Sequence, residues 1–200
     1  MGVKPDQPEA FFYLPCFIWY WYNGNRQEDE PKLERVFDVD NIKILFNKVD
    51  EAILIMKEVA GWGRAQGLRV WRDEWLTREE LITTEAQPEN FCVGVLDEQR
   101  VCAFILQWSD SEYWKNSPKY EAAYLHKFCV RREFAHRGMT KRVVEAIKKL
   151  CKDRNIKYIR LDTGLDEKVV RKIYLDAGFK IVNIIDYDNG NSMALYELEV

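Results

Sequence analysis

The chain has 200 residues, of which 47% are hydrophobic and 32% charged, with a formal net charge of -3 at pH 7. This length and balance predict one α/β domain with enough apolar material for a core, and argue against a second full domain. Residues 1–120 carry 14 basic and 21 acidic side chains, whereas residues 121–200 carry 16 and 12. The imbalance predicts an anionic ligand on the C-terminal half and leaves room for a cationic one on the other half, although differently solvated surfaces would give the same counts.

The cysteines and histidines limit the chemistry that the chain can perform. The five cysteines form no Cys-x-x-Cys pair, and four lie in apolar periodic segments. We interpret them as small core residues of a protein in a reducing compartment, which predicts a cytoplasmic location. Only two histidines are present, so a His-rich metal site is excluded and no metal is expected.

Residues 1–40 are expected to form an N-terminal extension that packs on the domain. Within it, Phe11 to Tyr22 (FFYLPCFIWYWY) is almost wholly apolar and aromatic. The segment is too short to span a bilayer, and it lacks the basic region and cleavage site of a signal peptide, so no membrane partner is expected. A lid over the substrate and a contact with a second subunit are the alternatives to simple packing.

Regular elements are predicted throughout a single domain, residues 41–200. Asn41 to Phe46 has the pattern of a short strand, and Val49 to Gly61 that of an amphipathic helix. Thr77, with Glu80 three residues later, has the spacing of a capping box and predicts the start of a second helix.

The second half of the chain predicts strands that alternate with helices. The expected elements are a hairpin of Phe91 to Leu96 and Val101 to Trp108 across a four-residue polar loop, a strand at Ala122 to Val130 with a helix after it, a strand at Ile156 to Asp162, a helix at Leu165 to Ala177, and a strand pair at Phe179 to Ile185 and Met193 to Leu198. A strand–helix–strand unit requires parallel neighbours, so the sheet should be mixed and covered by helices.

The stretch from Tyr124 to Lys149 runs from a strand through a basic, glycine-containing bend into an amphipathic helix. Unpaired N–H groups at a helix N-terminus, together with the helix dipole, favour a bound phosphate. The bend is surrounded by five basic residues: Arg131, Arg132, Arg137, Lys141 and Arg142. We therefore expect an anion site here. Nucleic acid is a less favoured ligand, because the pI is about 5.6 and few aromatics lie among the basic residues.

This stretch resembles the GNAT (Gcn5-related) N-acetyltransferases. The resemblance covers residue 41 to the C-terminus and is most specific in LHKFCVRREFAHRGMTKRVVEAI, followed by IKYIRLDTG and IYLDAGF. The family's acetyl-CoA loop is usually Q/R-x-x-G-x-G/A, and the corresponding residues are Ala135 to Thr140. Gly138 matches, whereas Ala135 and Thr140 depart from the pattern but remain small. The implied fold is an α/β (α+β) domain with a mixed, mostly antiparallel sheet of about six to seven strands and helices on both faces.

The resemblance implies direct transfer of an acetyl group from acetyl-CoA, the co-substrate, to an amine held beside it. The strand ending in Val130 would splay from the strand ending in Asp162, with the pantetheine arm in the gap and the pyrophosphate on His136 to Lys141. Glu167 stands where the family often has an Asn that reaches toward the pantetheine. The implied cofactor-binding residues are Phe128, Cys129, Val130, Ala135, His136, Arg137, Gly138, Met139, Thr140, Lys141 and Glu167.

The resemblance also suggests catalytic roles, each with a structural alternative. Tyr174 occupies the position of the tyrosine that protonates the departing thiolate, although a core tyrosine on a helix stripe would fit the same pattern. Tyr124 stands where the family often has a glutamate, and His126, on the same strand face, is the best candidate for the general base, or a structural histidine. Asp162 and Glu112 are further candidates, as relay acids or contacts to a cationic acceptor.

The expected function is therefore an acetyl-CoA-dependent N-acetyltransferase acting on the primary amine of a small molecule. The alternatives are a sensor that binds acyl-CoA without turnover and an enzyme that acetylates peptides or proteins. No nucleic-acid partner is expected, and a homodimer is compatible with the sequence.

Overall fold

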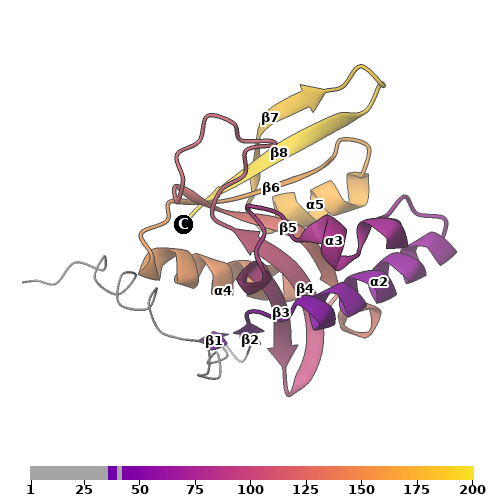
Figure 1. Cartoon of the computed structure of the whole chain (residues 1–200), viewed down its shortest axis with the longest axis vertical. Coiled ribbons are helices and arrows are strands. Elements are labelled where there is room, and N and C mark those ends of the chain that lie inside the picture. The colour runs from indigo at the N-terminus through magenta and orange to yellow at the C-terminus, as the bar shows by residue number, and fades with distance from the viewer. Residues whose placement is uncertain (1–35, 40–41) are drawn as a thin grey trace, which may run out of the picture. The chain divides into compact units, whose positions relative to one another are not determined.

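The computed structural model describes residues 36–39 and 42–200 (Figure 1). The aromatic segment Phe11 to Tyr22 and most of the expected N-terminal extension lie outside the described residues. The described strands are β1 (Val36–Val39), β2 (Ile42–Leu45), β3 (Phe91–Leu96), β4 (Gln99–Gln107), β5 (Ala122–Val130), β6 (Tyr158–Gly164), β7 (Lys180–Asp186) and β8 (Ser192–Glu199). The helices are α2 (Val49–Ala65), α3 (Arg78–Leu81), α4 (Met139–Asp153) and α5 (Lys168–Asp176), with 3-10 turns η1 (Asp73–Trp75), η2 (Pro88–Asn90) and η3 (Arg132–Phe134).

The strands form one mixed sheet in the order β1-β2-β3-β4-β5-β6-β8-β7. Among the described strands only β5 and β6 pair in parallel, and α4 makes the connection between them. The predicted α/β class and mostly antiparallel sheet are therefore confirmed. The described part of the sheet has eight strands, because β1, which the sequence did not predict, pairs with β2 at the edge.

Helices cover both faces of the sheet, as predicted (Figure 1). One apolar cluster packs α4 and α5 against residues such as Phe104, Leu125 and Leu161. The other packs α2 against residues such as Val93 and Ile105 on the opposite face, which we call the α2 face.

A β-bulge interrupts β5 beside the bend. Ile105 of β4 pairs with His126 and Ala103 pairs with Cys129, so two residues of β5 oppose one of β4. Lys127, inside the bulge, has a φ of 51°. The extra residue resets the alternation of side chains, so that both His126 and Cys129 lie toward the α2 face.

Some element boundaries differ from those predicted. Helix α2 continues to Ala65, past the predicted end at Gly61. The helix ends before Gly67, whose φ of 74° lets the N–H groups of Gly67 and Leu68 bond the carbonyls of Arg64 (2.9 Å) and Gly63 (3.0 Å). The Thr77 cap is confirmed, since its side chain accepts a hydrogen bond from the Glu80 N–H at 3.3 Å, although α3 spans only four residues.

Two further corrections concern chain reversals. Asp97 and Glu98, with φ of 50° and 61°, turn the β3–β4 hairpin in two residues, where four were predicted. Strand β6 begins at Tyr158 and not at Ile156, because the Ile156 N–H still bonds the Cys151 carbonyl (2.9 Å) at the end of α4. Among the described residues, no helix is long and apolar enough to cross a membrane.

Candidate active site

Strands β5 and β6 separate in the middle of the sheet. Their pairing ends at Tyr124 and Arg160, although β5 continues to Val130 and β6 to Gly164. The bulge in β5 lies beyond Tyr124, the last residue that pairs with β6, and it shifts the alternation of side chains by one residue. The splayed strands implied by the family resemblance are therefore present in this structure.

The turn between β5 and α4 presents main-chain N–H groups. Gly138 caps α4 in the left-handed conformation (φ 70°), and no atom lies within 4 Å of the position of an ideal Cβ. The N–H of Arg142 bonds the Gly138 carbonyl at 3.2 Å, so the N–H groups of Met139, Thr140 and Lys141 have no partner four residues back in the helix. The turn thus combines open space with the donors that an anion needs.

The basic side chains around this turn are not equivalent. Arg131 pairs with Glu58 of α2, at 2.7 Å between Nη2 and Oε2, and ties the turn to that helix. Arg137 lies over the ring of Phe134 at 5.4 Å. Arg137, Lys141 and the backbone positions at His136 and Gly138 are exposed.

A row of side chains crosses the α2 face where β5 and β6 separate. His126 and Asp162 each lie two residues beyond the last parallel pair and therefore face each other across the gap. Asp162 is paired with Leu195 of β8, which is paired with Asn183 of β7. Directly opposite residues of antiparallel strands share a face, so the row leads from His126 toward the edge of the sheet.

His126 lies between two carboxylates. Its Nδ1 is 3.5 Å from Asp162 Oδ1, and its Nε2 is 3.5 Å from Asp110 Oδ2. The Asp110 side chain is 5% exposed, against 15% for Asp162 and 19% for His126. Burial raises the pKa of Asp110. Hydrogen bonds from backbone N–H groups and the nearby His126 lower it and partly offset this increase. Within the described residues, these three offer ligand atoms that lie within 4.8 Å of one another.

Tyr174 is 8% exposed and packs edge-on against Phe179 (5.9 Å between centroids) and beside Tyr196 (6.0 Å). No hydrogen bond joins its hydroxyl to another of the described residues. Burial, with smaller contributions from Asp162 and Glu167, raises the pKa of the Tyr174 phenol. The hydroxyl therefore stays protonated, as a proton donor must, and the ring also belongs to the core.

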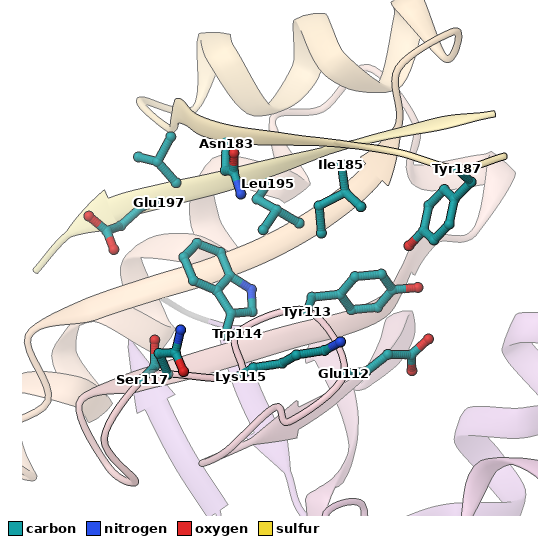
Figure 2. A pocket seen from close by; sticks show the side chains of 12 residues that line it. Glu112, Tyr113, Trp114, Lys115, Ser117, Asn183, Ile185, Tyr187, Leu195 and Glu197 are labelled. Atoms are coloured by element: carbon teal, nitrogen blue, oxygen red, sulfur yellow. The ribbon is translucent and has the colours of Figure 1, made fainter. Parts of the chain in front are cut away.

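A pocket of about 720 Å³ opens on the α2 face beside this row (Figure 2). Its lining comes from the loop between β4 and β5 and from the last two strands, namely residues 112–117, Val182, Asn183, Ile185, Tyr187, Leu195 and Glu197. Leu195 connects the two sites, because it lines the pocket and is the cross-strand partner of Asp162. Figure 2 shows Tyr113 and Tyr187 on opposite sides of the opening.

Arg160 supports one wall of the pocket. Its guanidinium donates to Glu197 (2.8 Å), to the hydroxyl of Ser117 (2.9 Å) and to that of Tyr124 (3.2 Å), and stacks over Trp114 at 4.4 Å. These bonds join the loop to three strands. The Tyr124 side chain is consequently buried beneath this network.

The charges near the pocket are mixed. Glu112 is exposed at its edge, and burial together with Asp162 and Glu112 raises the pKa of Tyr113. Lys127 extends from the bulge over the ring of Trp71 at 5.4 Å. Burial lowers the pKa of Lys127, although Asp162 and Glu112 act in the opposite direction.

The remaining predicted residues lie near the gap between β5 and β6. Phe128 packs edge-on against Phe104, and Cys129 is buried, which raises the pKa of its thiol. Glu167 precedes α5 and accepts a hydrogen bond from the Thr163 hydroxyl.

Sequence reasoning missed two residues of this region, Asp110 and Lys127. The segment Ser109-Asp110-Ser111 after an apolar strand is a signal for a side-chain-capped turn, and it could have indicated that Asp110 is held by the loop. The orientation of Lys127 depends on the bulge, and no residue pattern in β5 predicts that bulge.

Comparison with known proteins bears on the family and the fold. Residues 54–179 match the model of the acetyltransferase (GNAT) family. A search of curated proteins finds no match. The structure is similar to a GNAT-family acetyltransferase from Listeria monocytogenes (19% identity, TM-score 0.60, 83% of this chain and 100% of that one).

Two other similar structures carry more specific descriptions. One is the ribosomal-protein-S18-alanine N-acetyltransferase from Escherichia coli (12% identity, TM-score 0.54, 80% of this chain and 94% of that one). Another is a GNAT-family acetyltransferase from Elizabethkingia anophelis with acetyl-CoA bound (16% identity, TM-score 0.52, 81% and 100%).

The family match supports an N-acetyltransferase, that is, an acyltransferase that acts on amines. Because the family model matches more than half of the chain, the protein belongs to the GNAT acetyltransferase family. At these low identities the solved structures establish the fold alone, and they leave the class of acceptor open.

Proposed function

We propose that the protein transfers the acetyl group of acetyl-CoA to the primary amine of a small molecule bound in the pocket of Figure 2. The observation that carries this proposal is the position of the pocket, whose wall residue Leu195 is the cross-strand partner of Asp162. A volume of about 720 Å³ lies within the range of pockets for small molecules.

The residues at the turn fit the co-substrate. Unpaired N–H groups of Met139, Thr140 and Lys141, with the open space beside Gly138, suit a pyrophosphate. The main chain of Phe128 and Val130 borders the gap between β5 and β6 and is available to the pantetheine arm. Acetyl-CoA, when bound, supplies a thioester whose carbonyl carbon can accept an amine.

In this proposal His126 acts as the general base. An ammonium group must lose a proton before its nitrogen can attack, and a neutral imidazole can accept that proton. Asp162 stabilises the resulting imidazolium at Nδ1, 3.5 Å away. The raised pKa of the Tyr174 phenol keeps its hydroxyl protonated near neutral pH, and this hydroxyl donates a proton to the departing sulfur.

An acceptor screen tests this function by measuring release of the CoA thiol from acetyl-CoA. The expected result is turnover with a subset of small primary amines. His126→Gln should lower kcat on the order of 100-fold or more, the usual contribution of a general base. CoA binding without thiol release for any amine would favour the sensor, and peptides outperforming small amines would favour a peptide acetyltransferase.

A pocket-filling variant tests where the acceptor binds. Asn183→Trp adds bulk to a pocket-lining side chain of β7, so KM for the amine should rise while CoA affinity stays unchanged. Ile184→Trp is the matched control, because Ile184 is the next residue of β7, is exposed and does not line the pocket. Equal effects of both variants on KM would contradict the assignment.

A further inference from the structure

Among the described residues, three buried side-chain polar atoms lack a hydrogen-bond partner, and one of them is Nε1 of Trp114, which lines the pocket. The other two, Oδ2 of Asp110 and Nε2 of His126, lie 3.5 Å apart. The Asp110 side chain is 5% exposed, so water does not solvate this carboxylate freely. Buried polar atoms are nearly always paired, and each of these atoms is the available complement of the other.

The loop holds the Asp110 carboxylate in a fixed orientation. Its other oxygen, Oδ1, accepts hydrogen bonds from the N–H groups of Glu112 and Tyr113, both at 3.0 Å. The Asp110 carbonyl also accepts from the Trp114 N–H at 3.1 Å. With Oδ1 occupied by two donors, Oδ2 is left to point at the imidazole.

From this geometry we infer that Asp110 is a positioning residue that keeps the proton of neutral His126 on Nε2 and thereby makes Nδ1 the basic nitrogen. The inference rests on the proposed role of His126 as the base. An ionised carboxylate accepts hydrogen bonds and cannot donate them, so each carboxylate favours an N–H directed toward it. Asp110 decides between the two tautomers because its Oδ2 is buried without a hydrogen-bond partner among the described residues, whereas the Asp162 side chain is more exposed.

The tautomer determines the route of the substrate proton. Nε2 is buried against Asp110, whereas Nδ1 faces Asp162 at the gap between β5 and β6. A proton from the acceptor ammonium therefore goes to Nδ1 and produces an imidazolium with a carboxylate at each nitrogen. The other charged groups near this cluster are Glu112 on the loop and Lys127 on β5.

A metal ion is the alternative occupant of this cluster, because one ligand atom from each of the three residues lies within 4.8 Å of the other two. The shortest contacts, however, place the two carboxylates at opposite nitrogens of the ring, each 3.5 Å away. The arrangement instead resembles a histidine held by a carboxylate on the side away from its substrate.

The test is nitrogen NMR of the imidazole rings in the ligand-free protein, at a pH where His126 is neutral. The chain has two histidines, and His136 in the turn serves as the internal reference. We expect the neutral His126 ring to carry its proton on Nε2. A proton on Nδ1 overturns the inference, as does stoichiometric binding of added Zn²⁺ at Nε2.

Asp110→Asn should reverse the tautomer. Because the Asn oxygen remains with the N–H groups of Glu112 and Tyr113, its NH₂ group faces Nε2, which must then accept, and the ring proton moves to Nδ1. If the His126 ring of this variant kept its proton on Nε2, the inference would be overturned. Asp153→Asn, an exposed substitution at the end of α4, is the matched control.

Activity measurements separate this inference from the proposed function. With an accepted amine, Asp110→Asn should lower kcat on the order of 100-fold with a smaller change in KM. An unchanged kcat in a variant with the reversed tautomer overturns the positioning role. If wild type has the expected tautomer and transfers acetyl to no amine, the function fails and the assigned tautomer stands. If the variant does not fold, the tautomer of the wild type alone decides.

Discussion

The two ends of the β5–β6 gap are built by different means. The turn that precedes α4 presents main-chain N–H groups, and its geometry comes from neighbours in sequence, with Gly138 in the left-handed conformation. The cluster on the α2 face is made of side chains, and its members Asp110, His126 and Asp162 come from a loop and two strands. A backbone site tolerates changes of side chain, whereas a side-chain site depends on each residue and on the fold that assembles it.

The largest effect should come from obstructing the turn. Gly138→Glu places a carboxylate in open space beside the N–H groups of Met139 to Lys141. Like charges about 4 Å apart repel by about 4 kcal/mol at an effective dielectric constant of 20, so CoA affinity should fall on the order of 100-fold or more. Isothermal titration with CoA measures the loss.

Gly190→Glu controls for strain in that variant. Gly190 has a φ of 80° and equally open surroundings, but it lies in the β7–β8 hairpin. It should retain CoA affinity. Retained affinity in Gly138→Glu would refute the assignment of the turn.

The next effect concerns the proton donor. Tyr174→Phe keeps the ring that packs against Phe179 and Tyr196 and removes a hydroxyl with no partner among the described residues. kcat should fall on the order of 100-fold, with little change in CoA affinity or thermal stability. Steady-state kinetics and thermal melts make the comparison, with Tyr158→Phe as control. Turnover equal to that of wild type would leave Tyr174 as a core residue only.

A smaller effect should follow removal of one cation at the turn. Lys141 is exposed, and exposed ion pairs contribute about 0.2 to 1 kcal/mol, so Lys141→Ala should weaken CoA binding by about 1.5- to 5-fold. The difference should shrink as salt is added. Lys152→Ala, at the far end of α4, should have no effect. A loss as large as that of Gly138→Glu would mean that side chains, and not the backbone, hold the anion.

The smallest predicted effect is on stability and concerns the cluster. Burial raises the pKa of Asp110, so the folded protein holds that proton more tightly than the unfolded chain does. Wild type should therefore lose stability relative to Asp110→Asn as pH rises from the ordinary carboxyl pKa near 3.9 through the raised value. Melting temperatures from pH 4 to 8 would then favour the variant near neutrality, with the gap closing in acid. A gap that widens in acid would contradict this sign.

The sequence was informative where structure depends on neighbouring residues. The Gly138 turn, the Thr77 cap and the apolar face of α4 follow local rules, and the structure contains all three. The parallel β5–β6 pair followed from one topological rule.

What the sequence did not reveal depends on contacts between distant segments. Asp110 matters because its loop folds back over β5. Strand β6 starts two residues late because Ile156 completes the end of α4. The hydrogen bonds that orient the Asp110 carboxylate are local, but they direct it at an imidazole only because His126 lies beside it.

The bulge in β5 allows one strand to serve two purposes. Before it, even-numbered residues such as Tyr124 and His126 face the α2 side, and after it the odd-numbered Cys129 does so. The alternation of side chains from Phe128 to Val130 is thereby offset by one residue from that of the residues before the bulge. The strand can thus hold His126 in the cluster and still leave its later main chain along the gap beside β6. Deleting Lys127 would leave only Phe128 between His126 and Cys129, opposite Phe104 of β4, and would restore regular pairing with both residues still on the α2 face.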